Sequence, residues 1–338
     1  MSTIKIGING FGRIGRTFFR MAYGHPDIEV VSINDLGNLE NLAYLLQYDT
    51  AYGRSPFEVK AENGGLVVDG KTITFTQIKE PKELSWGAQG VDIVVESTGV
   101  FTSYEKSKVH IDAGARRVVI TGPVKEEPGG ATVLMGMNED ALTECEISSN
   151  ASCTTNATNP LIGILHEAIG IERAILSTTH AYTASQALVD GPSKKDMREG
   201  RAAAQNIVPS STGAAIATTL VHTDLKGKFD GISLRVPVPV GSIVDVTFVA
   251  KRPTTRDEVN EILRTGALSD RWSRLFAVTD EPLVSSDIIG ARHAAIADLE
   301  MTRVVDGTLV KVLAWYDNET SYTQTLVDHV VEAARLLR

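Results

Sequence analysis

The stretch at residues 7–15, GINGFGRIG, decides the fold because it carries the spacing Gly10-x-Gly12-x-x-Gly15. A short apolar strand pattern at 3–8 precedes it, and a helix pattern follows it directly. In this setting the glycines allow a tight turn, close approach of a pyrophosphate to the backbone, and close packing of helix on strand. The helix start adds free N–H groups and a partial positive charge. The stretch therefore predicts a dinucleotide-binding unit.

An acidic residue supports this interpretation. Asp35 closes the next strand pattern, at 28–35, and lies 20 residues after Gly15. An acid at this place accepts hydrogen bonds from ribose hydroxyls and repels a 2′-phosphate, so it favours NAD over NADP. The alternative is a sharp turn followed by a solvated aspartate at a strand end.

The first half of the chain alternates short apolar strands with helices. Strand patterns at 91–98 and 116–121 flank a helix pattern at 104–115, and a hairpin pattern turns at Asp69 and Gly70. Short β-branched strands that alternate with helices are typical of sheets buried on both faces. We predict a Rossmann-type, doubly wound parallel sheet.

The pattern changes after about residue 150. Longer strand patterns occupy 231–251 and 307–315, and helices such as 255–268 become fewer. This predicts a second, α+β domain with a mostly antiparallel sheet. The segment 321–338 has apolar residues at helical spacing and predicts an amphipathic helix.

Composition narrows the functional classes. The 338 residues are 43% hydrophobic and carry a formal net charge of −9, which disfavours a primary nucleic-acid role. No run approaches the roughly 20 apolar residues of a membrane helix. Two cysteines are too few for a disulfide scaffold, and the first residues show no signal-peptide pattern. We therefore expect a cytoplasmic protein with no membrane partner.

One cysteine lies in unusual surroundings. Cys153 lies within 149–159, SNASCTTNATN, just before a helix pattern, where backbone N–H groups and the helix dipole favour a thiolate. Among seven histidines, His180 is the best candidate base, because it ends a strand-like run among hydroxyl residues. The residues alone leave the alternative of an inert, half-buried cysteine open.

Several longer segments together are far more specific than the glycine spacing. They are INGFGRIGR, ESTGVF, SNASCTTN, THAYTASQ, DGPSKKDMREGRAAAQNIVPSSTGAA, RVPVPVGS, VSSDIIG and WYDNETSY. In these segments the chain resembles the phosphorylating glyceraldehyde-3-phosphate dehydrogenases, nearly from end to end. The resemblance implies that Cys153 is the nucleophile and His180 its base. It also implies oxidation of glyceraldehyde 3-phosphate through a thiohemiacetal and a thioester, which inorganic phosphate releases as an acyl phosphate in glycolysis or gluconeogenesis.

The resemblance further implies binding residues, and no metal. For NAD they are Gly10, Gly12, Arg13, Ile14, Gly15, Asp35, Lys79, Thr98, Gly99, Thr121 and Asn318. Thr183 and Arg235 would hold the substrate phosphate. The attacking phosphate would be held by Ser152, Thr154, Arg198, Thr212 and Gly213, with Arg201 as the alternative to Arg198.

The resemblance also implies an organisation: a homotetramer with an NAD-binding domain at 1–152, to which a last helix at 319–338 returns, and a catalytic domain at 153–318. Thr320 and Ser321 depart from the family, which usually has an aromatic residue and a glycine there.

Alternative functions stay open at this point. They are an erythrose-4-phosphate dehydrogenase, an NADP-preferring paralogue, another semialdehyde dehydrogenase that uses a cysteine thioester, and a nucleotide-binding scaffold without activity. Retention of both Cys153 and His180 argues against the inactive scaffold.

Overall fold

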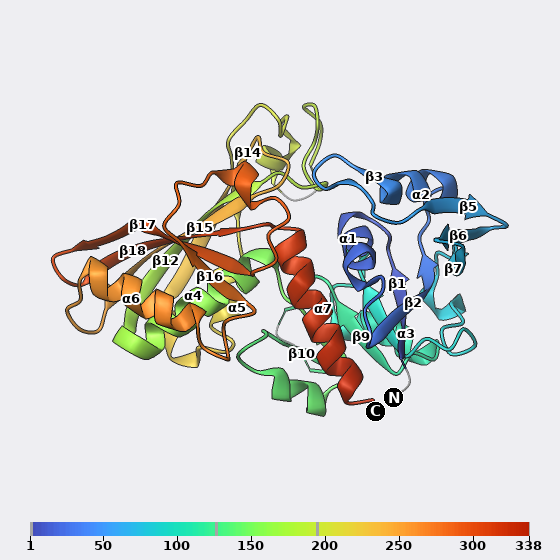
Figure 1. Ribbon diagram of the computed structural model, residues 1–338, viewed down its shortest axis with the longest axis horizontal. Helices are drawn as coiled ribbons and strands as arrows, with labels where there is room; N and C mark the ends of the chain where they lie inside the picture. Colours follow the sequence, from blue (N-terminus) through green and yellow to red (C-terminus); the bar gives the residue numbers. More distant parts are fainter. Residues whose placement is uncertain (1–2, 126–127, 194–195, 338) are drawn as a thin grey trace. The chain divides into compact units, whose positions relative to one another are not determined.

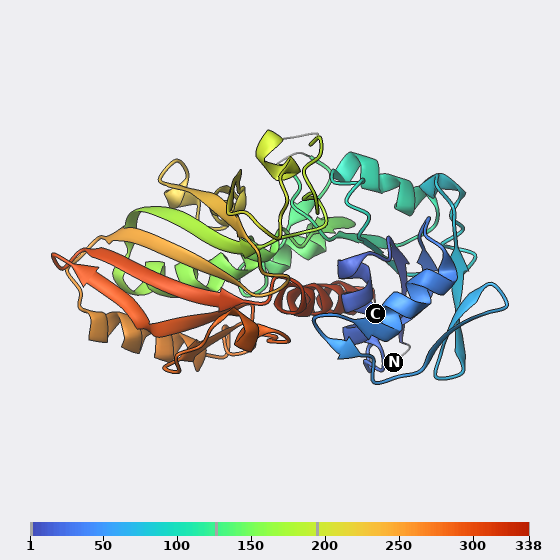
Figure 2. The ribbon, with the colours of Figure 1, turned by 90° about the horizontal axis from the view of Figure 1, so that it is seen from above.

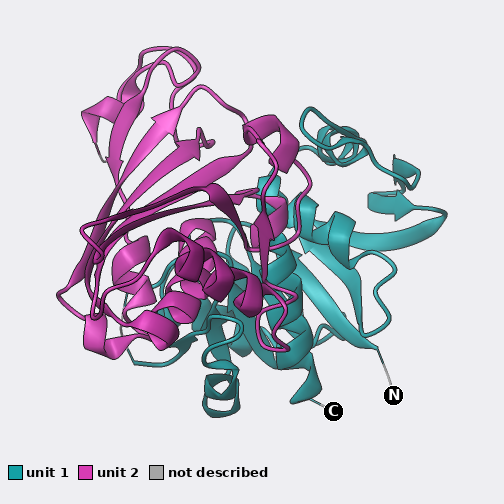
Figure 3. Ribbon diagram, turned by 60° about the vertical axis from the view of Figure 1, so that its left-hand side comes forward, with its two compact units in different colours: residues 1–151, 323–338 teal, residues 152–322 magenta. Residues whose placement is uncertain are grey.

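The computed structural model describes residues 3–125, 128–193 and 196–337. These residues form two compact units, drawn in teal and magenta in Figure 3. Unit 1 comprises 1–151 and 323–338, and unit 2 comprises 152–322. The domain boundaries given above stay a prediction.

Unit 1 is built on a nine-stranded sheet in the order β10-β11-β9-β8-β1-β2-β7-β6-β5 (Figure 1). All neighbours from β10 to β7 run parallel, and β7, β6 and β5 are antiparallel. The strands are β1 (Ile4–Asn9), β2 (Ile28–Asn34), β5 (Val59–Glu62), β6 (Gly65–Val68), β7 (Lys71–Thr76), β8 (Ile93–Glu96), β9 (Arg117–Ile120), β10 (Ala131–Thr132) and β11 (Ile147–Ser149). A separate two-stranded ribbon pairs β3 (Tyr48–Asp49) with β4 (Gly53–Arg54).

The parallel sheet forms because its central strands are apolar on both faces. Successive residues Val94 and Val95 of β8, and Val118 and Val119 of β9, are fully buried. The connecting helices are α1 (Arg13–Ala22), α2 (Leu39–Gln47) and α3 (Tyr104–Asp112). The predicted Rossmann-type sheet is confirmed. The hairpin between β6 and β7 turns at Asp69 and Gly70, both with positive φ, as predicted.

Unit 2 contains a seven-stranded sheet in the order β13-β14-β12-β15-β18-β17-β16. The β12–β14 and β16–β17 pairs are parallel and the other neighbours antiparallel, so the predicted mostly antiparallel sheet is also confirmed. The strands are β12 (Ile171–Ala181), β13 (Val208–Ser211), β14 (Phe229–Val236), β15 (Ser242–Ala250), β16 (Phe276–Thr279), β17 (Ala295–Val305) and β18 (Leu309–Tyr316).

Helices cover one face of this sheet. α4 (Cys153–Ile169) and α6 (Arg256–Ala267) pack against β17, and α5 (Ala214–Thr218) packs against β14 (Figures 1 and 2). In β15, buried and half-exposed residues alternate strictly, with Val244, Val246 and Phe248 buried. One sheet face is therefore core, and the other is partly open to solvent.

The last helix, α7 (Thr320–Arg335), carries a buried histidine into unit 1. His329 is 0% exposed and hydrogen-bonds with Ser148 Oγ through Nε2 (2.8 Å) and with Asn150 Oδ1 through Nδ1 (3.1 Å). Because the amide of Asn150 donates to Thr325, its oxygen accepts from His329, so Nδ1 carries the proton. Burial and the charge of Arg117 lower the pKa of His329 to about 3.

This histidine should make unit 1 sensitive to acid. An unfolded histidine binds a proton below about pH 6.5, whereas His329 in the folded chain stays neutral until about pH 3. The contribution of His329 to the free energy of unfolding is thus fully present above pH 6.5 and falls as the pH drops. Near pH 5 it has decreased by about 2 kcal/mol. We expect the unfolding free energy of His329→Gln to fall less than that of the wild type between pH 7.5 and 5, measured by urea denaturation. Parallel pH profiles for the two proteins would contradict this assignment.

Candidate active site

The structure brings Cys153 and His180 together. Cys153 is the first residue of α4, and Ser152 caps that helix by accepting a hydrogen bond from the backbone N–H of Thr155 (3.1 Å). His180 lies near the end of β12 and is 3% exposed. The sulfur Sγ of Cys153 lies 3.2 Å from Nε2 of His180. A thiol and a base are therefore in direct contact.

Burial sets the resting charge of this pair. It raises the pKa of the Cys153 thiol, and the opposing effects of Arg235 and of hydrogen bonds from Thr154 are smaller. It lowers the pKa of His180 to about 3, with a further contribution from Arg235. The pair therefore rests as thiol and neutral imidazole. The backbone N–H groups at the helix start favour the thiolate, as expected from the sequence, but desolvation outweighs them and the net shift of the Cys153 pKa is upward.

The contacts of the second ring nitrogen of His180 allow two tautomers. Nδ1 lies 2.6 Å from the carbonyl oxygen of Ala181 and 2.6 Å from Nη1 of Arg235, which also lies 3.3 Å from that carbonyl. Arginine can only donate, so Nδ1 accepts from Arg235 in one tautomer, with the ring proton on Nε2. In the other tautomer Nδ1 donates to the carbonyl, and Nε2 is left with a lone pair toward the Cys153 thiol. This tautomer is the base form.

Tyr316, for which no role was predicted, contacts both His180 and Thr154, the residue next to Cys153. Its hydroxyl hydrogen-bonds with Oγ1 of Thr154 (2.9 Å) and of Thr178 (2.8 Å), and its ring stands edge-on to His180 at 5.9 Å between centroids. Burial raises the pKa of this tyrosine well above its usual range. Alternation in β18 was the available signal, since it places Tyr316 on the buried face with Val312 and Ala314.

A cavity of about 490 Å³ opens in unit 1 at the ends of the central strands. Five residues predicted to bind the cofactor line it: Gly10, Gly12, Asp35, Lys79 and Thr98. The other predicted residues of this unit lie outside its lining: Arg13, Ile14 and Gly15 begin α1, Gly99 follows β8, and Thr121 follows β9.

The cavity fits the ribose and pyrophosphate of a dinucleotide. A Cβ placed on Gly12 would meet nothing within 4 Å, so the loop presents bare backbone on that side. Both carboxylate oxygens of Asp35 are fixed: Oδ2 accepts from the N–H of Phe11 (2.6 Å) and Oδ1 from that of Gly37 (2.7 Å). The remaining lone pairs can accept from ribose hydroxyls.

Comparisons with known proteins agree with this arrangement. The sequence model "Glyceraldehyde 3-phosphate dehydrogenase, NAD binding domain" matches residues 4–104, and "Glyceraldehyde 3-phosphate dehydrogenase, C-terminal domain" matches residues 152–318. The chain belongs to the glyceraldehyde-3-phosphate dehydrogenase family. Glyceraldehyde-3-phosphate dehydrogenase 1 of Bacillus subtilis is 46% identical over 327 residues, 96% of either chain. Glyceraldehyde-3-phosphate dehydrogenase of Mycobacterium avium is 46% identical over 343 residues, 99% of this chain and all of the relative.

The side-chain amide of Asn318, in unit 2, is held in one orientation. Its Oδ1 accepts from the N–H of Gly241 (3.2 Å) and from Oγ of Ser242 (2.9 Å). Among the described residues, these bonds use only the amide oxygen, which leaves the NH₂ group to donate. Donors of this kind suit a carboxamide oxygen.

The two residues that depart from the glyceraldehyde-3-phosphate dehydrogenase pattern belong to the turn into α7. Ser321 accepts from the N–H of Asp317 (3.0 Å) and donates to the carbonyl of Ala291 (3.0 Å). The N–H of Thr320 donates to Oδ1 of Asp317 (2.8 Å). Small polar residues here satisfy the backbone groups at the helix start.

The residues predicted for the phosphates come from several segments of unit 2. Ser152 and Thr154 flank it in sequence, and Arg235 contacts His180. Thr183 hydrogen-bonds with Ser185 (2.9 Å), Thr212 accepts from the N–H of Ala214 (3.2 Å), and Gly213 precedes α5. Arg201 pairs with Asp190 at 2.9 Å, whereas Arg198 lies 3.8 Å from Asp196. Arg198 is therefore the less constrained of the two arginines.

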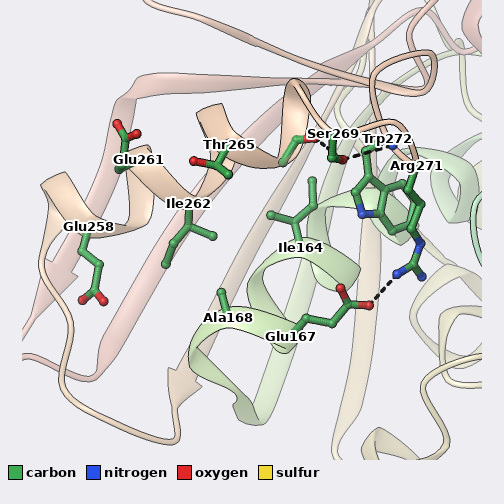
Figure 4. A pocket seen from close by; sticks show the side chains of 11 residues that line it. Ile164, Glu167, Ala168, Glu258, Glu261, Ile262, Thr265, Ser269, Arg271 and Trp272 are labelled. Carbon is green, nitrogen blue, oxygen red and sulfur yellow. Dashed lines mark hydrogen bonds and ion pairs between the residues drawn. The ribbon is translucent and has the colours of Figure 1, made fainter.

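A second cavity, of about 600 Å³, lies between α4 and α6 in unit 2 and contains none of the predicted site residues (Figure 4). Arg271 closes one end, where it pairs with Glu167 (2.7 Å) and stacks over Trp272 at 4.4 Å. This cavity is separate from the contact between Cys153 and His180.

The glycine loop gives a matched test of the cofactor cavity. We expect Gly12→Ala to change stability by less than about 1 kcal/mol, because its methyl group enters open space, but to raise the Kd for NAD at least about tenfold. A Cβ on Gly15 would lie 2.2 Å from the carbonyl oxygen of Gly10, so Gly15→Ala should instead cost about 1–3 kcal/mol. Thermal melts and NAD titrations separate the two effects. Unchanged NAD affinity in Gly12→Ala would exclude pyrophosphate binding at this loop.

Proposed function

We propose that this chain oxidises D-glyceraldehyde 3-phosphate with NAD and inorganic phosphate to 1,3-bisphosphoglycerate, in glycolysis or gluconeogenesis. The observation that carries the proposal is the 3.2 Å contact between Cys153 Sγ and His180 Nε2 in a member of this family. A thiol next to a neutral base is suited to covalent capture of an aldehyde.

The neutral resting pair makes the first step a proton relay. As Sγ of Cys153 bonds to the aldehyde carbon, Nε2 of His180 takes the thiol proton and returns it to the carbonyl oxygen as that oxygen becomes a hydroxyl. The product is a thiohemiacetal, and His180 is again a neutral base. The low pKa of His180 favours this rapid return of the proton.

Oxidation and release use the same two residues. NAD, when bound, supplies the hydride acceptor. His180 takes the hydroxyl proton as the hydride leaves the same carbon, and the carbon becomes the thioester carbonyl. Phosphate oxygen then bonds to that carbonyl carbon and the carbon–sulfur bond breaks. The leaving sulfur of Cys153 recovers its proton from His180, which closes the cycle.

Two phosphate groups require two anion sites. We propose that Thr183 and Arg235 hold the substrate phosphate, because a planar guanidinium binds phosphate oxygens in pairs. The attacking phosphate would be held by Ser152, Thr154, Arg198, Thr212 and Gly213. The NH groups at the start of α4 support an anion next to Cys153.

For the cofactor, we propose that Asp35 binds the adenosine ribose and that Asn318 binds the nicotinamide carboxamide. The glycine loop would approach the pyrophosphate, with the remaining predicted residues around it: Arg13, Ile14, Lys79, Thr98, Gly99 and Thr121. We further propose the domain boundaries 1–152 with 319–338, and 153–318.

We also propose a cytoplasmic homotetramer. The partly open face of the seven-stranded sheet supports self-association, since Ile175 of β12 and Ile232 of β14 are 59% and 52% exposed there. Within the described residues, no helix is long and apolar enough to cross a membrane. Light scattering coupled to size exclusion should give four chains per particle at micromolar concentration. A monomer would contradict the proposed assembly.

The function is tested with a panel of phosphorylated aldehydes. Glyceraldehyde 3-phosphate and erythrose 4-phosphate are offered with NAD or NADP, with and without phosphate, and the reduced cofactor is followed by absorbance. We expect steady turnover only with glyceraldehyde 3-phosphate, NAD and phosphate together. Without phosphate, the thioester should accumulate after a burst of about one NADH per site. Preference for erythrose 4-phosphate or NADP would favour the paralogues, and undiminished turnover without phosphate would indicate a hydrolytic enzyme.

Cys153→Ser is the matched control for this panel. The hydroxyl keeps nearly the same shape but is a much weaker nucleophile, so NADH production should fall by more than about 1,000-fold. The affinity for NAD should stay unchanged. Turnover near that of the wild type would rule out the covalent route, and failure of all combinations in a wild type that binds NAD would favour the inactive scaffold.

A further inference from the structure

Four neighbouring strands of unit 1 end on polar residues that lie side by side. Thr76 of β7, Asn34 of β2, Asn9 of β1 and Glu96 of β8 are register partners in that order across the sheet. Asn34, Asn9 and Glu96 are at most 4% exposed. We call these four residues the strand-end row.

Hydrogen bonds run along the whole row. The hydroxyl of Thr76 donates to Oδ1 of Asn34 (2.8 Å), Nδ2 of Asn34 donates to Oδ1 of Asn9 (2.8 Å), and Nδ2 of Asn9 donates to Oε2 of Glu96 (2.6 Å). The backbone of Ile78 fixes this direction, since its N–H donates to Oδ1 of Asn34 and its carbonyl accepts from Nδ2, both at 2.9 Å. Neither amide can turn over without losing a partner.

A second chain of donors reaches Glu96 from the opposite side. Nε1 of Trp86 donates to Nδ1 of His110 (3.1 Å), and Nε2 of His110 lies 2.9 Å from Oε2 of Glu96. Indole nitrogen is only a donor, so Nδ1 of His110 carries the lone pair and Nε2 carries the proton. The ring is therefore neutral, fully buried, and a donor to Glu96.

Glu96 accepts from every partner around it. Oε2 takes the bonds from Asn9 and His110, and Oε1 takes bonds from the backbone N–H of Thr98 (2.8 Å) and from the Thr98 hydroxyl. A carboxylate satisfies this set fully, because both of its oxygens accept. A buried anion that ends two chains of donors holds both in one arrangement.

The neighbours of Glu96 belong to the wall of the cofactor cavity, which is lined by Asn9, Asn34, Ile78 and Thr98. Glu96 itself does not line that cavity. We propose that Glu96 is a positioning residue for the dinucleotide: it fixes the amide of Asn9 and the backbone of Thr98 in the shape that receives the cofactor, and His110 and Trp86 hold it there. The proposal rests on the NAD-dependent function proposed above.

A glutamine at this position has nearly the same shape but cannot satisfy the same partners. With its NH₂ group toward Asn9 and His110, it would face two donors. With its NH₂ group toward Thr98, it would face the backbone N–H. Turning over the amides of Asn9 and then Asn34 would only move the mismatch along the row, because the NH₂ group of Asn34 would then face the backbone N–H of Ile78, which can only donate. One amide in place of one carboxylate thus disturbs the whole wall.

The test compares Glu96→Gln with the wild type in titrations with NAD and with ADP-ribose, a probe that binds without reacting. We expect Glu96→Gln to raise both Kd values at least about tenfold, through the unsatisfied donors at the wall. Ser148→Ala is the matched control, since it removes another buried hydrogen bond of the same sheet, to His329, away from the cavity. It should lower the melting temperature and leave both Kd values unchanged.

A double variant tests the chain of donors. Without the indole donor in Trp86→Phe, His110 can place its proton on Nδ1 and accept a hydrogen bond from the glutamine through Nε2. The double variant Trp86→Phe with Glu96→Gln should therefore have a lower Kd for ADP-ribose than the summed free-energy effects of the two single variants predict. In the wild-type protein, ¹⁵N NMR should show the His110 tautomer protonated at Nε2. This reading does not depend on any variant folding.

The outcomes separate the two proposals. If the wild type binds NAD and Glu96→Gln binds NAD and ADP-ribose within twofold of it, Glu96 serves stability alone and the inference is wrong. A His110 protonated at Nδ1, or at both nitrogens, would equally overturn it. If the wild type itself does not bind NAD, the proposed function fails first.

Discussion

The proposed chemistry depends on holding a half-buried thiol 3.2 Å from a buried imidazole. Desolvation raises the pKa of Cys153 and lowers that of His180, so it favours the neutral form of both groups. The surroundings of the pair are polar rather than apolar, with Thr154 and Arg235 close by. Those groups oppose the desolvation of Cys153 and stabilise negative charge when it develops on sulfur or oxygen.

Features that depend on local sequence were predicted well. The glycine spacing, the β-branched runs and the hairpin turn at Asp69 and Gly70 each place a short segment by its own backbone preferences and burial. The pairing of Cys153 with His180 was one option among several from the residues, and the family resemblance selected it. The structure adds the distance between them.

Features that depend on distant partners were not predictable from one sequence. The strand β17 contains Asp298 and Glu300, which weaken its strand pattern in the sequence. Its pairing with β18 stabilises it as a strand in the folded chain. Tyr316 was hidden because its role comes from Thr178, far away in the chain. The net direction of the Cys153 pKa shift was not predictable for the same reason: the helix start is visible in the local sequence, but the desolvation that outweighs it arises only in the folded chain.

Three of the buried histidines, His110, His180 and His329, differ in what their ring nitrogens contact. In His110 and His329, one nitrogen donates and the other accepts within the protein, so each ring joins two fixed groups. In His180, Nδ1 contacts both the carbonyl of Ala181 and Nη1 of Arg235. Its other nitrogen faces the thiol of Cys153, whose proton can leave. Burial is thus common to all three rings, and in the proposed mechanism the contact of Nε2 with Cys153 is what makes His180 the base.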